Sequence, residues 1–157
     1  IGGSLARSLR AANAVGEIVG CGRRRENLEA AIRLNVIDEF TSDPVEAVAG
    51  ADMVVVATTL GATAEIFSKI APAISAATVV TDVGSAKQRV IELAFSDFGE
   101  RIGQFVPGHP IAGSEHSGVE ASFAELFQNH RVILTPTEQT GAAALSAVTK
   151  MWGRMGS

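Results

Sequence analysis

The fold class can be predicted from one stretch of ten consecutive residues, Thr78-Val79-Val80-Thr81-Asp82-Val83-Gly84-Ser85-Ala86-Lys87. Its first six residues are largely β-branched, which predicts a short strand buried on both faces. A loop that contains Gly84 follows, and residues 86–98 then favour a helix. A strand that passes through a short loop into a helix is half of a βαβ unit, the building block of parallel sheets.

The same alternation extends in both directions from this stretch, at a spacing of about 25–35 residues. Strands are predicted over residues 17–22, 52–57, 78–83, 104–106 and 131–135. Helices are predicted over residues 4–14, 25–34, 62–74, 86–98, 119–126 and 141–154, and a short one begins at Asp43-Pro44. Residues 1–157 are therefore predicted to form one α/β domain, a Rossmann-like doubly wound parallel sheet. Its first strand would precede Ile1, and we expect it to be missing from this sequence.

Composition narrows the class of protein and of partner. The 157 residues are 46% hydrophobic and 19% charged, which is typical of a globular domain. A net charge of −4 argues against nucleic acid as a partner, because binding phosphates needs a basic face. No apolar run approaches the roughly 18 residues that span a bilayer, so no membrane partner is expected. The single Cys21 cannot form an internal disulfide, which predicts a cytoplasmic protein. We expect Cys21 to be small apolar filler at a strand end, with a reactive thiol as the alternative.

The residues Ile1-Gly2-Gly3 stand directly before a predicted helix, as in the end of a loop that binds a dinucleotide. Glycines let the backbone approach a pyrophosphate, and the helix N-terminus supplies amide donors. A pair of glycines at an ordinary helix start is the alternative. The predicted strand over residues 17–22 follows at the right distance and favours the nucleotide.

The end of that strand predicts which nucleotide binds. An acid commonly stands there and holds the ribose hydroxyls, but here Gly22 is followed by Arg23-Arg24-Arg25. Arg23 and Arg24 could pair with the 2′-phosphate of NADP. The sequence therefore favours NADP, with NAD possible, and a solvated basic turn is the alternative.

Two further loops at the carboxyl ends of predicted strands offer hydroxyl groups, and ligands bind at that edge of an open parallel sheet. Thr58 and Thr59 could admit a nicotinamide ribose, or could be an ordinary strand-to-helix loop. Ser85 could bond the substrate or the nicotinamide, or could only cap the following helix. We expect Lys87 in the solvated first turn of that helix, with attraction of an anion as the alternative.

The stretch Pro107-Gly108-His109-Pro110-Ile111-Ala112-Gly113-Ser114-Glu115-His116-Ser117-Gly118 carries the most specific chemistry. His109 lies between a glycine and a proline just past a predicted strand. Its backbone is therefore fixed on both sides, which gives the imidazole a defined direction. Oxidation of an alcohol needs an acceptor for the hydroxyl proton, and imidazole suits that task at neutral pH. A structural histidine that bonds its own loop is the alternative. Ser114 and Glu115 could line the mouth of the site or only cap the loop, and His116 and His130 are expected at the surface.

These motifs, in this order, resemble the prephenate dehydrogenase family. The matching segments are residues 1–6, residues 82–87, residues 108–115 with Ser117-Gly118, and Val132-Ile133-Leu134-Thr135-Pro136. The segment His-Pro-Ile-Ala-Gly-Ser-Glu is the specific one, since many dehydrogenases share the glycines. The resemblance implies oxidative decarboxylation of prephenate or arogenate with NAD(P) in tyrosine biosynthesis.

The resemblance also implies roles for particular residues. His109 would accept the hydrogen bond from the ring hydroxyl, and Ser85 would be the active-site serine. Ser114 and Glu115 would bind the substrate. The family's helical domain, which builds the homodimer and supplies a basic residue for the substrate carboxylate, would lie beyond Ser157, so we expect this chain alone to be inactive.

Two other functions stay open from the sequence. A different Rossmann NAD(P)-dependent hydroxyacid dehydrogenase would use a lysine from a helical domain, and a nucleotide-sensing domain would be non-catalytic. The His109 loop argues against both. The sequence shows no ligand pattern for a metal, no Gly-x-Ser-x-Gly elbow and no P-loop lysine.

Overall fold

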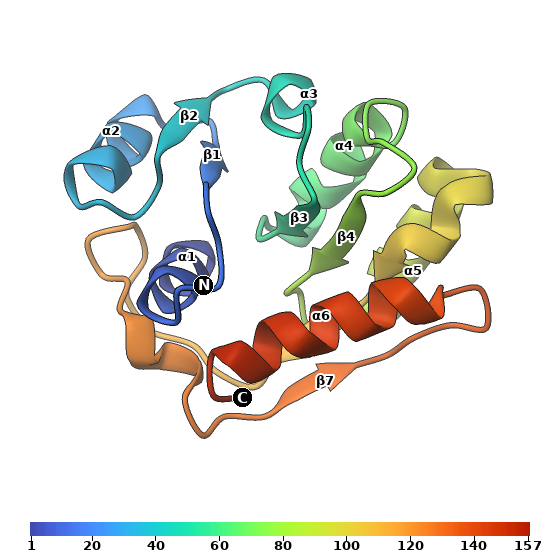
Figure 1. The fold of residues 1–157 in the computed structure, drawn as a ribbon. Coiled ribbons are helices and arrows are strands. Elements are labelled where there is room, and N and C mark those ends of the chain that lie inside the picture. The colour runs from blue at the N-terminus through green and yellow to red at the C-terminus, as the bar shows by residue number, and fades with distance from the viewer.

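The computed structural model describes all residues from Ile1 to Ser157, with the parallel strands in two groups (Figure 1). The smaller group pairs β1 (Val19–Cys21) with β2 (Glu39–Thr41). The larger group has the order β3 (Met53–Val56), β4 (Val79–Asp82) and β5 (Phe105–Val106). All neighbours in these groups run parallel, which confirms the predicted α/β fold with parallel strands.

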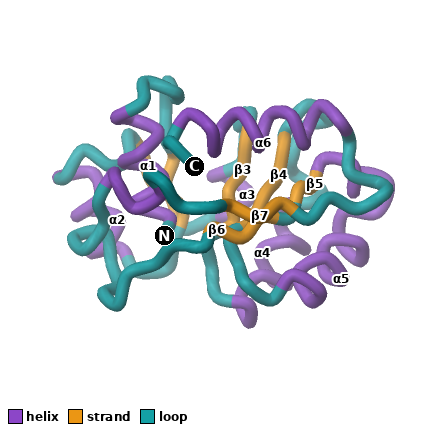
Figure 2. Tube along the Cα trace, turned by 90° about the horizontal axis from the view of Figure 1, so that it is seen from below, coloured by secondary structure: helices purple, strands orange, loops and turns teal.

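Helices cover both faces of the larger group. The six α-helices are α1 (Gly2–Ala11), α2 (Arg25–Arg33), α3 (Pro44–Ala47), α4 (Leu60–Ile70), α5 (Lys87–Phe98) and α6 (Ala142–Arg154). Figure 2 shows α6 on one side of β3, β4 and β5, and α4 and α5 on the other. A 3₁₀ helix over Gly99–Gln104 joins α5 to β5. None of the helices is both long and apolar enough to cross a membrane.

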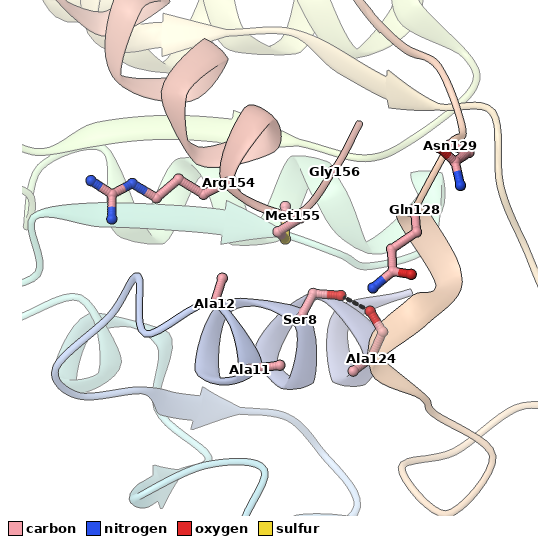
Figure 3. Close-up of a pocket in the computed structure, with 9 residues that line it drawn as sticks. All are labelled: Ser8, Ala11, Ala12, Ala124, Gln128, Asn129, Arg154, Met155 and Gly156. Atoms are coloured by element: carbon pink, nitrogen blue, oxygen red, sulfur yellow. Dashed lines mark hydrogen bonds between the residues drawn. The ribbon is translucent and has the colours of Figure 1, made fainter.

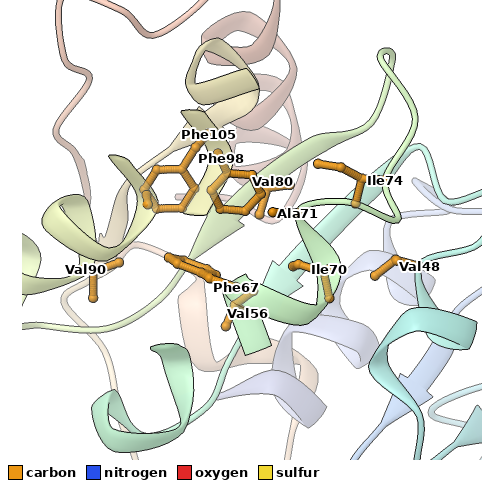
Figure 4. Packing of buried hydrophobic residues seen from close by; sticks show 11 residues of the cluster. Val48, Val56, Phe67, Ile70, Ala71, Ile74, Val80, Val90, Phe98 and Phe105 are labelled. Atoms are coloured by element: carbon orange, nitrogen blue, oxygen red, sulfur yellow. The ribbon is translucent and has the colours of Figure 1, made fainter. Parts of the chain in front are cut away.

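Alternation along β3 explains these layers, because successive side chains of a strand point to opposite faces. Val54 and Val56 pack into the core on the α4 and α5 side, whereas Met53 and Val55 pack into the core on the α6 side. On the first side Phe67 is fully buried, and its ring lies 5.1 Å from that of Phe98 and 5.3 Å from that of Phe105 (Figure 4). The continuous apolar runs therefore do correspond to strands covered on both faces.

The last predicted strand does not join the parallel sheet. β7 (Val132–Leu134) pairs antiparallel with β6 (Gly108–Pro110), whose residues were expected to form a loop. Glycine and proline are depleted in strands, so the local pattern at 108–110 predicts no strand. The pairing with β7 nevertheless organises these residues, and it places His109 directly opposite Ile133.

The helix predicted over residues 119–126 is wrong. Only a 3₁₀ helix, η2 (Ala124–Phe127), forms there. Backbone amides in this segment bond side chains from distant elements: Asn27 Oδ1 accepts from Val119 at 3.0 Å, and Ser4 Oγ accepts from Phe123 at 3.3 Å. In a helix the amide of Phe123 would instead donate to the carbonyl oxygen of Val119, so its bond to Ser4 replaces a helical bond. At α3, in contrast, the predicted cap is confirmed, since Asp43 Oδ1 accepts from Val45 N–H at 2.9 Å.

Candidate active site

The loops that carry the candidate residues meet at one edge of the sheet. β3 and β4 are parallel, and Val56 is in register with Asp82, so both strands end there. The amide of Val83 donates to the carbonyl oxygen of Val56 at 3.4 Å, which ties the two strand ends together. α1 starts at the same edge, because a Cβ added to Gly2 would lie 3.3 Å from the Cβ of Ala57.

The start of α1 fits the pyrophosphate of a dinucleotide. No side chain caps its N-terminus, and its first turn contains no acidic residue, so its amide donors and positive dipole end are available to an anion. A side chain at Gly3 would be crowded, because its Cβ would lie 3.0 Å from that of Ser122. Backbone amides beside small residues are the donor set that a pyrophosphate needs.

The three arginines that follow β1, Arg23 to Arg25, differ in the contacts that their side chains make. Arg25 is held by Glu29, with Nε 2.8 Å from Oε1, and lies over the ring of Phe40. Arg23 and Arg24 are exposed, and neither guanidinium group forms a hydrogen bond or an ion pair within the chain. Both guanidinium groups are therefore available for an anionic ligand.

Thr58 and Thr59 begin the loop into α4, and both are exposed. Thr58 Oγ1 lies 3.3 Å from Thr63 Oγ1, whereas the side chain of Thr59 makes no capping bond although Thr59 is the N-cap of α4. The pKa of Glu65, farther along α4, is lowered chiefly by the hydrogen bond from Lys69, and Arg23 adds to the lowering. Arg23 therefore lies close enough to α4 for their charges to interact.

A buried ion pair joins the end of β4 to the start of β6. Lys87 Nζ contacts Asp82 Oδ2 and also donates to the carbonyl oxygen of Gly108 at 2.7 Å. Asp82 Oδ1 accepts from the amide of Gly108 at 3.2 Å, and Asp82 Oδ2 accepts from that of Gly84 at 2.9 Å. We call Asp82, Lys87 and Gly108 the clamp.

Lys87 was expected in a solvated helical turn, and that expectation is wrong. Only 15% of its side chain is exposed, against 3% for Asp82. Burial lowers the pKa of the Lys87 ammonium, while the hydrogen bond and the charge of Asp82 act in the opposite direction. The signal in the sequence is an acid at the end of a buried strand with a lysine five residues later.

Ser85 and His109 are both linked to the clamp through the glycine that precedes each of them. Ser85 directly follows Gly84 and His109 directly follows Gly108, and both glycine amides bind the one carboxylate of Asp82. Ser85 does not cap α5, whose N-cap is Ala86, and the exposed Ser85 hydroxyl makes no hydrogen bond in the chain. The half-buried imidazole of His109 likewise bonds nothing in its own loop. Both groups are left to bind a ligand.

The other candidate residues are less closely tied to this pair. Ser114 and Glu115 are exposed, and no hydrogen bond joins them to His109 or Ser85. Ser114 Oγ accepts from the amide of His116 at 3.3 Å, which is a bond within the loop. His116 and His130 are exposed, as predicted.

Cys21 corrects one expectation from the sequence. It lies at the end of β1 as predicted, but it is exposed rather than apolar filler. Partial burial of the thiol raises its pKa, and the charge of Asp43 adds to the effect. The thiolate is therefore disfavoured, which argues against a nucleophilic role.

A hollow of about 400 Å³ lies at the carboxyl end of α1, away from this edge (Figure 3). It is lined by Ser8, Ala11, Ala12, Ala124, Gln128, Asn129, Arg154, Met155 and Gly156. Arg154 is the only ionisable side chain among them, and Ser8 is already bonded to the carbonyl of Ala124. The hollow offers no acid–base pair, so the candidate site is the edge that carries His109.

The fold and this edge define a Rossmann-type nucleotide-binding domain. Residues 5–157 match the family described as prephenate dehydrogenase, nucleotide-binding domain, and the chain belongs to that family. It is 36% identical over 152 residues to the prephenate dehydrogenase of Bacillus subtilis, covering 96% of this chain and 41% of that protein. It is 38% identical over 123 residues to the cyclohexadienyl dehydrogenase of Zymomonas mobilis, covering 78% of this chain and 41% of that protein.

A solved structure agrees with this assignment. The crystal structure of prephenate dehydrogenase from Aquifex aeolicus, in complex with hydroxyphenyl propionate and NAD⁺, has a TM-score of 0.89 and 36% sequence identity to this chain. The match covers 98% of this chain and 53% of that one. The chain thus spans about two fifths of the length of the curated relatives that it matches.

Proposed function

We propose that the full-length protein containing this chain catalyses the oxidative decarboxylation of prephenate or arogenate with NAD(P)⁺, a step of tyrosine biosynthesis. The observation that carries this proposal is the placement of His109 and Ser85. Neither side chain bonds the protein, and each follows a glycine whose amide binds the same buried carboxylate, at the sheet edge where α1 begins. A nucleotide-sensing domain would have no need for a histidine held in this way.

The reaction can be written so that atoms and electrons balance. The hydroxyl-bearing ring carbon loses a hydride and its hydroxyl proton, and the ring carboxylate leaves as carbon dioxide. The electron pair of the broken carbon–carbon bond completes the aromatic ring, and the phenolic oxygen regains the proton. The oxidised nicotinamide, when bound, supplies the acceptor for the hydride.

The residues of this chain would orient the substrate and move the proton. Neutral His109 accepts the hydroxyl proton as the hydride leaves and returns it to the phenolic oxygen. The Ser85 hydroxyl donates to the substrate or to the nicotinamide amide and fixes their relative orientation. Ser114 and Glu115 would line the mouth of the site.

The nucleotide would be held by the start of α1 and the loops beside it. The amides that follow Ile1-Gly2-Gly3 would bind the pyrophosphate, and Thr58 and Thr59 would lie beside the nicotinamide ribose. We further propose that a helical domain follows residues 1–157, forms a homodimer and supplies a basic group for the substrate carboxylate.

An assay of the purified full-length protein tests this function. Prephenate and arogenate are each offered with NAD⁺ and with NADP⁺, and reduced nicotinamide and carbon dioxide are both measured. We expect one carbon dioxide for each reduced nicotinamide with at least one of the two substrates. Reduction without carbon dioxide from a simple hydroxyacid would instead support another Rossmann dehydrogenase, and nucleotide binding without turnover of any substrate would support a sensor.

The unpaired arginines lead to a prediction about the cofactor. If Arg23 and Arg24 bind a 2′-phosphate, the full-length enzyme prefers NADP⁺. Replacing both with Ala is then expected to weaken NADP⁺ binding by about 1–3 kcal/mol, the range for charge-assisted hydrogen bonds, and to leave NAD⁺ binding nearly unchanged. Titration calorimetry with each nucleotide measures the difference.

Arg33→Ala is the matched control, because Arg33 is an exposed arginine in the last turn of α2, away from the loop. It should bind both nucleotides as the unmodified enzyme does. Equal affinity of the unmodified enzyme for NADP⁺ and NAD⁺ would show that these arginines form only a solvated turn.

A further inference from the structure

Gly108 has both of its backbone polar groups turned away from its partner strand. In an antiparallel ladder only alternate residues bond across the pair. The amide of Thr135 donates to Pro107 O at 3.0 Å, and the amide of Ile111 donates to Arg131 O at 2.8 Å. Pro107 and Ile111 are thus bonded across the pair, and Gly108 is one of the alternate residues that are not. Its N–H and C=O therefore point away from β7, toward the end of β4. There the clamp supplies the partners that these buried groups require.

The clamp uses charged groups where uncharged ones could fill the space. Asp82 is 2% exposed, and its carboxylate and the Lys87 ammonium are paired inside the protein. Replacing a buried ion pair by apolar side chains of similar volume is often neutral or stabilising. The free energy of folding therefore does not explain why the pair is charged. Its hydrogen bonds, in contrast, hold the backbone at two places, Gly84 and Gly108.

Those two places are next to the groups that carry the proposed chemistry. Asp82 binds the amide of Gly84, directly before Ser85, and the amide of Gly108, directly before His109. Lys87 holds the other side of Gly108 and neutralises Asp82. A displacement of about 1 Å at a reacting group can lower a rate 10²-fold, so restraint at these points bears directly on catalysis.

We infer that Lys87 is a positioning residue, which holds the backbone that aims the His109 imidazole and the Ser85 hydroxyl at one substrate without contacting that substrate. This inference rests on the proposed function. It assigns Lys87 a role different from attraction of the anionic substrate, since two of its three ammonium donors are engaged by Asp82 and Gly108.

Lys87→Met in the full-length enzyme is the first test, because methionine keeps most of the side-chain length but not the charge or the donors. We expect kcat to fall about 10²-fold, with the KM for prephenate and the Kd for the nucleotide changed by less than about threefold. Lys150→Met is the matched control, because Lys150 is exposed on α6 and forms no ion pair. That control should match the unmodified enzyme.

Two further variants separate positioning from stability. Lys87→Met leaves Asp82 buried without a partner, so it is also expected to unfold at a lower temperature. The double variant Asp82→Asn with Lys87→Met removes the stranded charge. Its unfolding temperature should recover in part, because the single oxygen of asparagine can accept from only one of the two glycine amides that Asp82 binds. Its kcat should stay low, because the Gly108 carbonyl still lacks its donor. Lys87→Arg keeps a charged donor and should recover about tenfold of the lost kcat.

A histidine NMR spectrum of the full-length protein tests the placement of His109 without any turnover. The Cε1–H signal of His109, assigned by its loss in His109→Asn, should shift or broaden in Lys87→Met and in the double variant, whereas that of exposed His130 should not. If the unmodified enzyme oxidises neither substrate, the proposed function is wrong, and this spectrum alone decides the role of Lys87. An unchanged His109 signal overturns the inference, as does a double variant that recovers both stability and kcat.

Discussion

Replacing His109 with Asn in the full-length enzyme is expected to lower kcat by about 10²–10⁴-fold, the usual contribution of a positioned acid–base group. Asparagine has a similar reach and stays polar, but it has no basic nitrogen to accept the hydroxyl proton. The half-buried imidazole makes no hydrogen bond in the chain, so the substitution breaks no existing bond. Affinity for the nucleotide should change little, because we propose that the start of α1 and the loops beside it hold that ligand. Steady-state kinetics and nucleotide titration measure the two effects separately.

His130→Asn is the control, since His130 is exposed and its Nδ1 bonds only the carbonyl of Gln128. It should leave kcat unchanged. A His109→Asn enzyme that keeps more than about half of the original kcat would reject proton transfer by His109, provided that chemistry limits the rate. Loss of nucleotide binding instead of kcat would make His109 a residue of the cofactor site.

Gly108→Ala is expected to lower kcat by about 10²-fold, through the backbone rather than through a lost functional group. A Cβ at this position would lie 2.9 Å from the carbonyl oxygen of Asp82 and 3.4 Å from Thr81 Oγ1. Thr81 cannot give way easily, because its hydroxyl donates to the carbonyl of Val106 at 2.7 Å. The start of β6 must therefore move away from the end of β4, and His109 moves with it.

Gly16→Ala is the matched control for this substitution. A Cβ at Gly16 would meet no atom within 4 Å, and Gly16 is exposed in the bend before β1. Its kcat should equal that of the unmodified enzyme. A Gly108→Ala enzyme with the same kcat as this control would show that the clamp does not need a glycine at that point.

The elements that were predicted well are those whose pattern is local. The runs over residues 52–57 and 78–83 contain enough β-branched residues in sequence to predict β3 and β4, and each is followed by a helix. Asp43-Pro44 predicts the start of α3 because the capping bond spans only two residues. The fold class follows from such segments alone.

The elements that were missed depend on residues far apart in the chain. β6 forms because residues 108–110 pair with residues 132–134. The burial of Lys87 depends on the carbonyl of Gly108, 21 residues later. A local pattern does not contain either partner, so the sequence indicated a loop in the first case and a solvated lysine in the second.

The candidate site likewise has one part that a local pattern predicts and one part that depends on residues far apart in the chain. His109 could be predicted as a candidate active-site residue because the glycine and proline that indicate it, Gly108 and Pro110, are its neighbours in the chain. The link between Ser85 and His109, that Asp82 binds the amide of the glycine before each of them, depends on residues far apart in the chain.

Proton transfer by His109 is tested by the pH dependence of kcat/KM, measured for the unmodified enzyme and for His109→Asn. Only a neutral imidazole can accept the hydroxyl proton, so activity of the unmodified enzyme should rise with pH through a single ionisation. The variant should retain its low activity without that rise. The same ionisation in both enzymes would contradict the claim, because the group that titrates would then not be His109.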